Sequence, residues 1–325
     1  MPPPAHSDHH GWIGTEMVET RFGDFEFQNG YHPVASRALG DCNMCPTPTR
    51  IHSTCWQTIL SLTLGVAIAA AQTTKTGITK TGIAYDVAGR GPAVVLITGS
   101  NLDRRMWARE RDWLSAGHIV IRYDLRAHGQ SETAKAPFSH VDDLISLLDE
   151  LAVSKATLIG LSAGSTIALD LALQAPERVE RMVLVGPSIS GYVPKEQLPF
   201  ATDLISALQK RDYRKAGEVL LATSVFAVPS ESQALVRSMV MENDRLWTVP
   251  REFLKPSRPA VDRLQEVKIP MLVLVGEKDT FQREQADLLA QRVPGARLVV
   301  IPGGGHLLNL TSPEEFRSAA MTFLN

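Results

Sequence analysis

Five consecutive residues constrain the fold of this chain most: Gly160-Leu161-Ser162-Ala163-Gly164 separate an apolar run, residues 156–161, from a helix-like stretch, residues 164–174. A turn that passes so sharply from strand to helix leaves almost no room for a side chain two residues before and after the serine. Gly160 and Gly164 meet that requirement. The pattern predicts that Ser162 is a nucleophile; the alternative is an ordinary β-to-α turn whose serine caps the helix.

Short β-rich runs alternate with helical stretches from Ile83 onward, which predicts an α/β fold with a mostly parallel sheet flanked by helices. The expected strands are residues 83–87, 93–98, 118–123, 156–161, 182–185, 271–275 and 297–301. The expected helices are residues 104–115, 141–151, 165–174, 282–292 and 313–324. Between Pro187 and Pro270 amphipathic stretches occur without a strand, so we expect an inserted helical cap at about residues 188–265.

The composition is that of a soluble globular protein, with 325 residues, 44% apolar and 21% charged side chains. The formal net charge of -2 and the scattered basic residues leave no basic stripe for a phosphate backbone. We therefore expect no nucleic-acid partner and a small-molecule ligand instead. The oligomeric state stays open.

The N-terminal part of the chain reads differently from the rest. Residues 1–43 are aperiodic, and we expect them to be unstructured or to lie upstream of the true translation start. Translation from Met44 would place the uncharged run of residues 58–71 in a leader, residues 44–71, that ends in Ala69-Ala70-Ala71. This pattern is typical of a secretory signal peptide cleaved before Gln72.

Export is therefore the expected localisation, with residues 72–325 as the mature domain and no stable membrane insertion after cleavage. The alternatives are an uncleaved membrane anchor and a buried helix in a cytoplasmic protein. All three cysteines, Cys42, Cys45 and Cys55, precede the cleavage site, so the mature chain would contain no disulfide.

A serine hydroxyl needs a base to take its proton and a carboxylate to orient that base. The mature chain has four histidines, His118, His128, His140 and His306, and we favour His306 because it follows a glycine-rich loop after the last strand. Asp279 follows the preceding strand and is the preferred acid, with Glu277 as the weaker candidate. Either carboxylate is also compatible with a solvated turn.

The order Ser162, Asp279, His306 resembles the chain order of the α/β-hydrolase family over residues 80–325. Residues 124–131, Asp-Leu-Arg-Ala-His-Gly-Gln-Ser, are similar to the family's D-x-R-x-x-G-x-S loop. In that loop we expect Asp124 to be a structural partner of Arg126. The resemblance implies a Ser-His-Asp triad, with no cofactor and no metal.

The resemblance also implies an oxyanion hole made of two backbone N–H groups, those of Ala163 and Ser100. The family's loop at this place usually reads His-Gly, whereas this chain has Thr98-Gly99-Ser100. Backbone donors do not depend on side-chain identity, and each contributes roughly 3 kcal/mol to stabilising the tetrahedral intermediate.

The reaction implied by the resemblance is hydrolysis of a carboxylic ester of small or medium apolar substrates through an acyl-enzyme. Carbon–carbon bond hydrolysis, perhydrolysis, acyl transfer, aminopeptidase activity and a non-turnover ligand-binding role remain alternatives on the same fold. Residues expected to line an apolar pocket are Leu102, Met106, Trp107, Phe200, Phe226, Trp247 and Phe253, each of which is also compatible with plain core packing.

Overall fold

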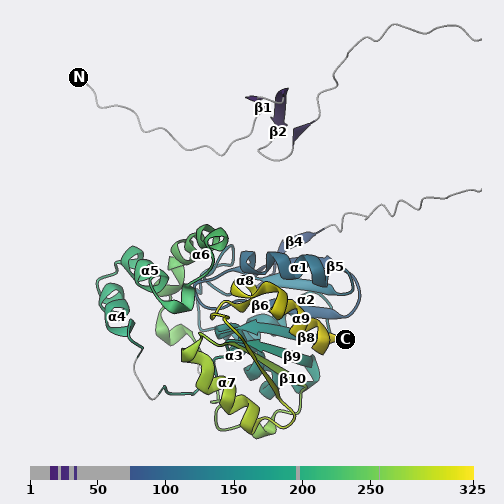
Figure 1. Ribbon diagram of the computed structural model, residues 1–325, viewed down its shortest axis with the longest axis vertical. Coiled ribbons are helices and arrows are strands. Elements are labelled where there is room, and N and C mark those ends of the chain that lie inside the picture. The colour runs from purple at the N-terminus through teal and green to yellow at the C-terminus, as the bar shows by residue number, and fades with distance from the viewer. Residues whose placement is uncertain (1–14, 21–22, 29–32, 35–73, 195–197, 256) are drawn as a thin grey trace, which may run out of the picture. The chain divides into compact units, whose positions relative to one another are not determined.

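The computed structural model describes residues 15–20, 23–28, 33–34, 74–194, 198–255 and 257–325 (Figure 1). Contacts divide the chain into two compact units, residues 1–67 and 68–325. The predicted leader at residues 44–71 lies outside the described residues.

In the first unit, β1 (Thr15–Thr20), β2 (Gly23–Gln28) and β3 (Pro33–Val34) form a three-stranded antiparallel sheet. The sequence predicts little stable structure here, and the described strands differ from that prediction.

An eight-stranded, mostly parallel sheet organises the second unit, in the order β11-β10-β9-β8-β6-β7-β5-β4. Only β5 runs against the other seven strands, since it pairs antiparallel with both β4 and β7. The strands are β4 (Lys75–Ile78), β5 (Ala84–Gly89), β6 (Ala93–Ile97), β7 (Ile119–Tyr123), β8 (Ala156–Leu161), β9 (Val179–Val185), β10 (Met271–Gly276) and β11 (Arg297–Ile301).

Helices cover both faces of this sheet, and the strand period of two divides the core accordingly. On β6, Val95 and Ile97 belong to the core cluster that also contains residues of α2, α3 and α7, whereas Val94 and Leu96 belong to the cluster that contains residues of α1, α9 and the cap. The helices are α1 (Ala108–Leu114), α2 (His140–Glu150), α3 (Ala163–Gln174), α7 (Thr280–Arg292), α8 (Leu308–Thr311) and α9 (Pro313–Leu324). The predicted α/β fold class is confirmed.

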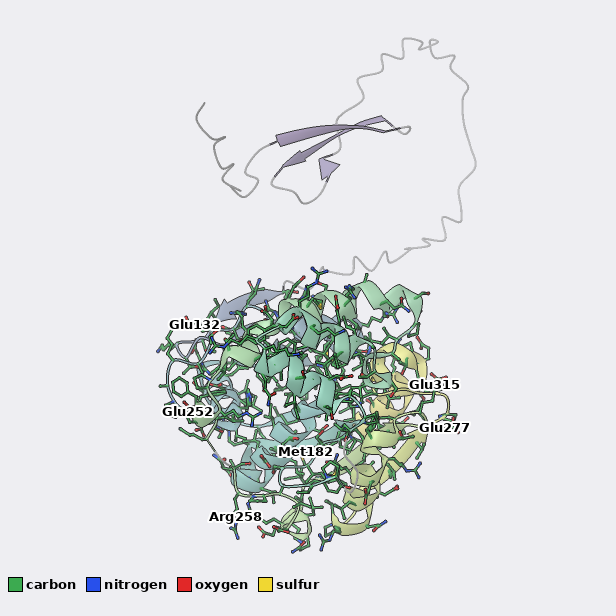
Figure 2. The ribbon with its side chains drawn as sticks, turned by 90° about the vertical axis from the view of Figure 1, so that its left-hand side faces the viewer. Glu132, Met182, Glu252, Arg258, Glu277 and Glu315 are labelled. Atoms are coloured by element: carbon green, nitrogen blue, oxygen red, sulfur yellow. The ribbon has the colours of Figure 1, made fainter. Side chains whose placement is uncertain are left out.

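Side chains drawn on the ribbon show the same division between core and surface (Figure 2). Met182 of β9 is fully buried, while Glu132, Glu252, Arg258, Glu277 and Glu315 project from the surface.

Between β9 and β10 the chain leaves the sheet and forms helices α4 (Ala201–Gln209), α5 (Tyr213–Leu221) and α6 (Ser230–Glu242), which gather at one end of the unit in Figure 1. Short 3₁₀ turns complete the chain: η1 (Arg104–Trp107), η2 (Pro176–Arg178), η3 (Ser224–Phe226), η4 (Asp244–Thr248), η5 (Arg251–Phe253) and η6 (Leu264–Glu266). Buried Leu220, Val236 and Met239 join the cap to the core cluster on the α1 face of the sheet. This helical insertion lies where the sequence predicts a cap.

Candidate active site

Ser162 occupies the single residue between β8 and α3, with φ of 52° and ψ of -115°. Residues other than glycine rarely adopt such a left-handed backbone, and strain of this kind concentrates at functional sites. The two glycines make the turn possible: a Cβ at Gly160 would lie 2.4 Å from the Gly164 oxygen, and one at Gly164 would lie 2.4 Å from the Ile97 oxygen. The Ser162 amide donates to the Val185 oxygen at 2.9 Å, which anchors the turn to β9.

His306 and Asp279 meet beyond the ends of β11 and β10, with His306 Nδ1 2.7 Å from Asp279 Oδ2. Both residues are 3% exposed. A carboxylate can only accept here, so Nδ1 carries the proton and Nε2 of the neutral ring is left as an acceptor. Glu277 instead accepts a hydrogen bond from the Gly303 amide at 2.8 Å and is exposed.

Gly186, directly after β9, allows this pair to form. A Cβ at Gly186 would lie 2.7 Å from His306 Nδ1 and 3.0 Å from Asp279 Oδ2. Any larger residue would therefore displace the imidazole or the carboxylate.

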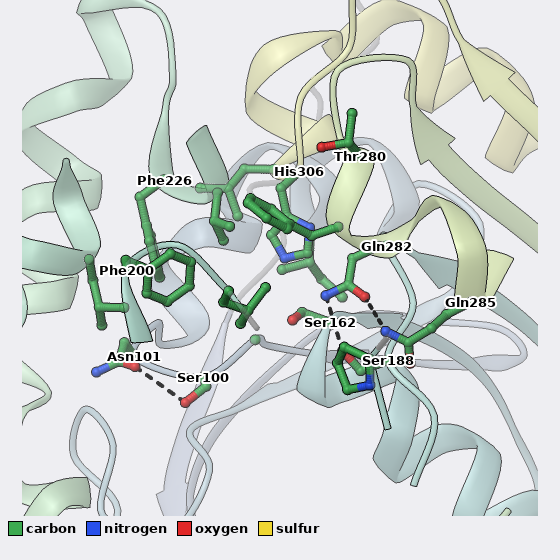
Figure 3. Close-up of a pocket in the computed structure, with 18 of the residues that line it drawn as sticks. Ser100, Asn101, Ser162, Ser188, Phe200, Phe226, Thr280, Gln282, Gln285 and His306 are labelled. Carbon is green, nitrogen blue, oxygen red and sulfur yellow. Dashed lines mark hydrogen bonds between the residues drawn. The ribbon is translucent and has the colours of Figure 1, made fainter. Parts of the chain in front are cut away.

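Ser162 and His306 line one cavity of about 750 Å³ between the sheet and the cap (Figure 3). Within the described residues the Ser162 hydroxyl has no hydrogen-bond partner. The hydrogen bond between a nucleophile and its base is often long or poorly aligned until substrate binds.

The two predicted oxyanion donors flank Ser162. Ala163 is the first residue of α3, so its N–H has no acceptor within the helix. Ser100 lies after β6 and lines the cavity, and a Cβ at Gly99 would lie 3.4 Å from the Ser162 Cβ. Among the described residues no acceptor is found for the Ser100 amide. Ala163 follows Ser162 in the chain but is not itself one of the residues that line the cavity.

The loop that carries Ser100 is held from outside the site. Asn101, with φ of 62°, donates its N–H to His128 Nε2 at 3.3 Å, and its carbonyl oxygen accepts from Asn243 Nδ2 at 3.4 Å. His128 Nδ1 lies 2.9 Å from the Arg126 oxygen and must donate there, which leaves Nε2 as the acceptor. Burial lowers the pKa of His128, which favours this neutral form.

The sequence profile of the Alpha/beta hydrolase family matches residues 94–319. The chain belongs to this family. A pimeloyl-(acyl-carrier protein) methyl ester esterase of Nitrosomonas europaea is 28% identical over 250 residues, which cover 73% of this chain and 97% of the esterase. A 2-hydroxy-6-oxononadienedioate/2-hydroxy-6-oxononatrienedioate hydrolase of Burkholderia vietnamiensis is 29% identical over 266 residues, covering 76% of this chain and 92% of that hydrolase.

Solved structures show the same fold. A hydrolase from Pseudomonas aeruginosa superposes with a TM-score of 0.63 and 26% identity, covering 78% of this chain and 99% of its own. An enol-lactonase from Burkholderia xenovorans superposes with a TM-score of 0.67 at 23% identity, covering 77% of this chain and 99% of its own. The predicted resemblance to the α/β-hydrolase family is confirmed.

The D-x-R-x-x-G-x-S loop of this α/β-hydrolase requires one correction. Asp124 is buried and structural, but it pairs with the guanidinium and backbone N–H of Arg104, not with Arg126. Arg126 instead forms a two-pronged ion pair with Asp143 of α2, at 2.5 and 2.9 Å. The prediction was wrong about the partner because the chain turns after Asp124, so the two neighbours face different elements.

Only some of the residues that were predicted to line an apolar pocket do line the cavity. Leu102, Phe200 and Phe226 line the cavity. Met106 and Trp107 are instead buried in the core, where Trp107 packs on Phe316 with ring centroids 6.2 Å apart. Trp247 packs beside Tyr213 and Phe253 bonds through its carbonyl to Phe138, so neither reaches the cavity.

The sequence-based reasoning missed a polar wall of the cavity, made by Ser188, Gln282 and Gln285. Ser188 follows β9 and both glutamines lie on α7 after β10. Ligands of open α/β sheets bind beyond the carboxyl ends of the strands, and this rule was the signal available in the sequence.

The cavity is poor in charge. Glu284 and His306 are the only Asp, Glu, Lys, Arg or His side chains among the described residues that line it. Across the described residues, no group of three or more His, Cys, Asp or Glu is placed to hold a metal ion. No described helix is long and apolar enough to cross a membrane.

Proposed function

We propose that this α/β hydrolase is a serine carboxylic-ester hydrolase that uses Ser162, His306 and Asp279. One observation carries the proposal. Ser162, held in a strand-to-helix turn with positive φ, lines the same cavity as His306, whose Nδ1 is hydrogen-bonded to the buried carboxylate of Asp279. This is the arrangement needed to generate an alkoxide-like nucleophile at neutral pH.

In the proposed reaction Ser162 Oγ attacks the ester carbonyl while His306 Nε2 takes its proton. Asp279 stabilises the imidazolium that forms, and the Ser100 and Ala163 N–H groups donate to the developing oxyanion. The intermediate collapses to an acyl-serine as His306 passes the proton to the leaving alkoxide. Water, activated by the same histidine, then releases the carboxylic acid.

The cavity supports a small or medium uncharged substrate. Its volume of about 750 Å³ and its apolar cap side suit an acyl or alkyl chain. The described lining contains no lysine or arginine, so none of the described residues would supply a counter-charge to a carboxylate on the substrate.

Hydrolysis of a carbon–carbon bond is the second candidate, favoured by the similarity to the Burkholderia vietnamiensis hydrolase. The name of that relative specifies a dioate, which carries two carboxylates, and the described lining of this cavity, with Glu284 and no lysine or arginine, is a poor match for such a substrate.

The proposal is tested by the hydrolysis of p-nitrophenyl esters, from acetate to palmitate, by the wild type and by Ser162→Ala. We expect wild-type activity with a preferred acyl length set by the cavity, and a loss on the order of 10⁵-fold or more in the variant. A folded wild type that is inactive on every ester, or activity that survives in Ser162→Ala, would contradict the proposal.

A further inference from the structure

The polar wall of the cavity is a chain of hydrogen bonds (Figure 3). The Ile189 amide donates to Gln285 Oε1 at 2.8 Å, and Gln285 Nε2 lies 2.6 Å from Gln282 Oε1. Gln282 Nε2 lies 3.4 Å from Ser188 Oγ. The chain thus runs from a backbone amide through two glutamines to a serine hydroxyl.

The backbone amide sets the direction of every bond in this chain. An N–H can only donate, so Gln285 must present its oxygen to Ile189 and its nitrogen to Gln282. Gln282 must then present its oxygen to Gln285 and its nitrogen to Ser188. An amide nitrogen does not accept hydrogen bonds, so the Ser188 hydroxyl cannot donate back to Gln282.

Ser188 is therefore left with a hydroxyl proton to donate. Among the described residues this proton has no acceptor, and Ser188 lines the cavity beside Ser162. The backbone of Ser188 is fixed, because its carbonyl accepts from Thr166 Oγ1 of α3 at 3.0 Å. A hydroxyl donor on an anchored backbone that lines a cavity is a binding position for an acceptor atom of a ligand.

The chemistry of the surroundings restricts that acceptor. The described lining presents an anionic acceptor with the carboxylate of Glu284, which repels it, and with no lysine or arginine. Phe200 and Phe226 lie across the cavity from Ser188, so the opposite end of the ligand is apolar (Figure 3). The ligand that fits is a neutral molecule with an oxygen acceptor on one side and an alkyl or aryl group on the other.

We propose that Ser188 is a substrate-binding donor and that the preferred substrates are neutral esters with a second oxygen acceptor, such as an ether, hydroxyl or keto oxygen, besides the ester group. This inference rests on the proposed ester hydrolysis and specifies its substrate class. Gln282 acts as a positioning residue, since it touches Ser188 and fixes which way the hydroxyl donates.

Pairs of esters that differ by one oxygen in place of one CH₂ test the inference in the full-length protein. On the acyl side the pair is p-nitrophenyl methoxyacetate and p-nitrophenyl butyrate; on the alcohol side it is 2-methoxyethyl butyrate and butyl butyrate. The ratio of kcat/KM within a pair is compared between enzymes, so the intrinsic reactivity of each ester cancels.

We expect Ser188→Ala to lower the ether-to-alkyl ratio in at least one pair by roughly threefold to tenfold, the contribution of one neutral hydrogen bond. Ser224→Ala is the matched control: it removes an exposed cap serine that does not line the cavity, and the ratios should not change.

Gln282→Glu gives a readout that a merely structural role would not produce. A carboxylate would accept from both Gln285 and the Ser188 hydroxyl, so Ser188 would turn its lone pairs to the cavity. The ether preference should fall to the level of Ser188→Ala, while the variant remains folded by circular dichroism.

The two proposals fail differently. If wild type hydrolyses the butyrates, Ser162→Ala does not, and neither ratio changes in Ser188→Ala, the Ser188 inference is wrong while ester hydrolysis stands. If Ser162→Ala hydrolyses the butyrates like wild type, the proposed function itself is wrong. An ether preference retained in Gln282→Glu would also overturn the assignment of Ser188 as a directed donor.

Discussion

Asp279 contacts His306 through only one of its carboxylate oxygens. The other, Oδ1, is buried and has no partner among the described residues. Leaving such an atom unpaired costs free energy, and a residue that served only to stabilise the fold would be expected to pair both oxygens. The single contact of the Asp279 carboxylate with His306 therefore fits a role in stabilising the imidazolium form of His306 during the reaction.

Replacing Asp279 by asparagine should lower kcat by roughly 10³-fold to 10⁴-fold, because an amide no longer stabilises the imidazolium and disturbs the tautomer of His306. The measurement is steady-state hydrolysis of p-nitrophenyl butyrate. Glu277→Gln is the matched control, since Glu277 contacts the Gly303 amide instead of His306, and it should change kcat by less than about twofold. Equal losses in the two variants would contradict the assignment of the acid.

Gly186 provides a second test at the residue scale. Gly186→Ala places a Cβ within 2.7 Å of His306 Nδ1, so the pair must shift and kcat should fall by roughly a hundredfold. Gly295→Ala is the control, because Gly295 also has positive φ, 77°, but nothing lies within 4 Å of the added atom. It should cost only about 1 to 2 kcal/mol of unfolding free energy. Thermal melts and kcat are measured on both, and unchanged kcat in Gly186→Ala would contradict the geometry.

At the residue scale, the sequence predicts best those residues whose place in the fold follows from their position relative to a strand. Ser162 stands directly after β8, and Asp279 and His306 lie in the segments that follow β10 and β11; strand ends meet at one edge of a parallel sheet. Ion-pair partners such as Arg104 for Asp124 depend on how distant elements pack. So does the choice between core and cavity for Trp107 or Phe226, because composition does not distinguish the two environments.

Among the elements, α1 contacts α8, the short helix that follows His306 in the chain. Glu110 of α1 is 2% exposed, and Asn309 Nδ2 of α8 lies 3.3 Å from its Oε2. Burial raises the pKa of Glu110 from its ordinary 4.5 to about 7. The folded protein therefore binds this proton more tightly than the unfolded chain does.

This difference predicts how stability depends on pH. As pH rises from about 4.5 to 7, the unfolded chain releases the proton first, so Glu110 reduces the unfolding free energy. Glu110→Gln should remove the effect. The variant should gain on the order of 2 to 3 kcal/mol over wild type between pH 5 and pH 8, measured by urea denaturation. A difference between variant and wild type that does not change with pH would contradict it.

The elements themselves were largely predictable. The central strands are continuous apolar runs in the sequence because both faces of the sheet are covered. Ser139 caps α2, since its Oγ accepts from the Val141 and Asp142 amides. The edge strand β4, mostly exposed, has no apolar pattern to reveal it. The four-residue α8 is too short to show a helical period.

At the scale of the whole molecule, the division of the chain matters for localisation. Residues 74–194, 198–255 and 257–325 contain the sheet, the cap and the candidate site. We propose that the preceding segment directs export, as its apolar run and small residues predict. Protein expressed from the full gene in a bacterium should be recovered outside the cytoplasm with Gln72 as its first residue, by N-terminal sequencing. Intact protein that stays in the cytoplasm with residues 44–71 attached would contradict export.

The central claim is that Ser162 is the nucleophile, and covalent labelling tests it most directly. The full-length protein is incubated with an alkyl fluorophosphonate, which phosphonylates activated serines, and the adduct is located by peptide mass spectrometry. We predict one adduct, on Ser162, formed in step with the loss of esterase activity and absent from Ser162→Ala. Labelling of another residue with loss of activity, or full activity in a protein labelled on Ser162, would contradict the account.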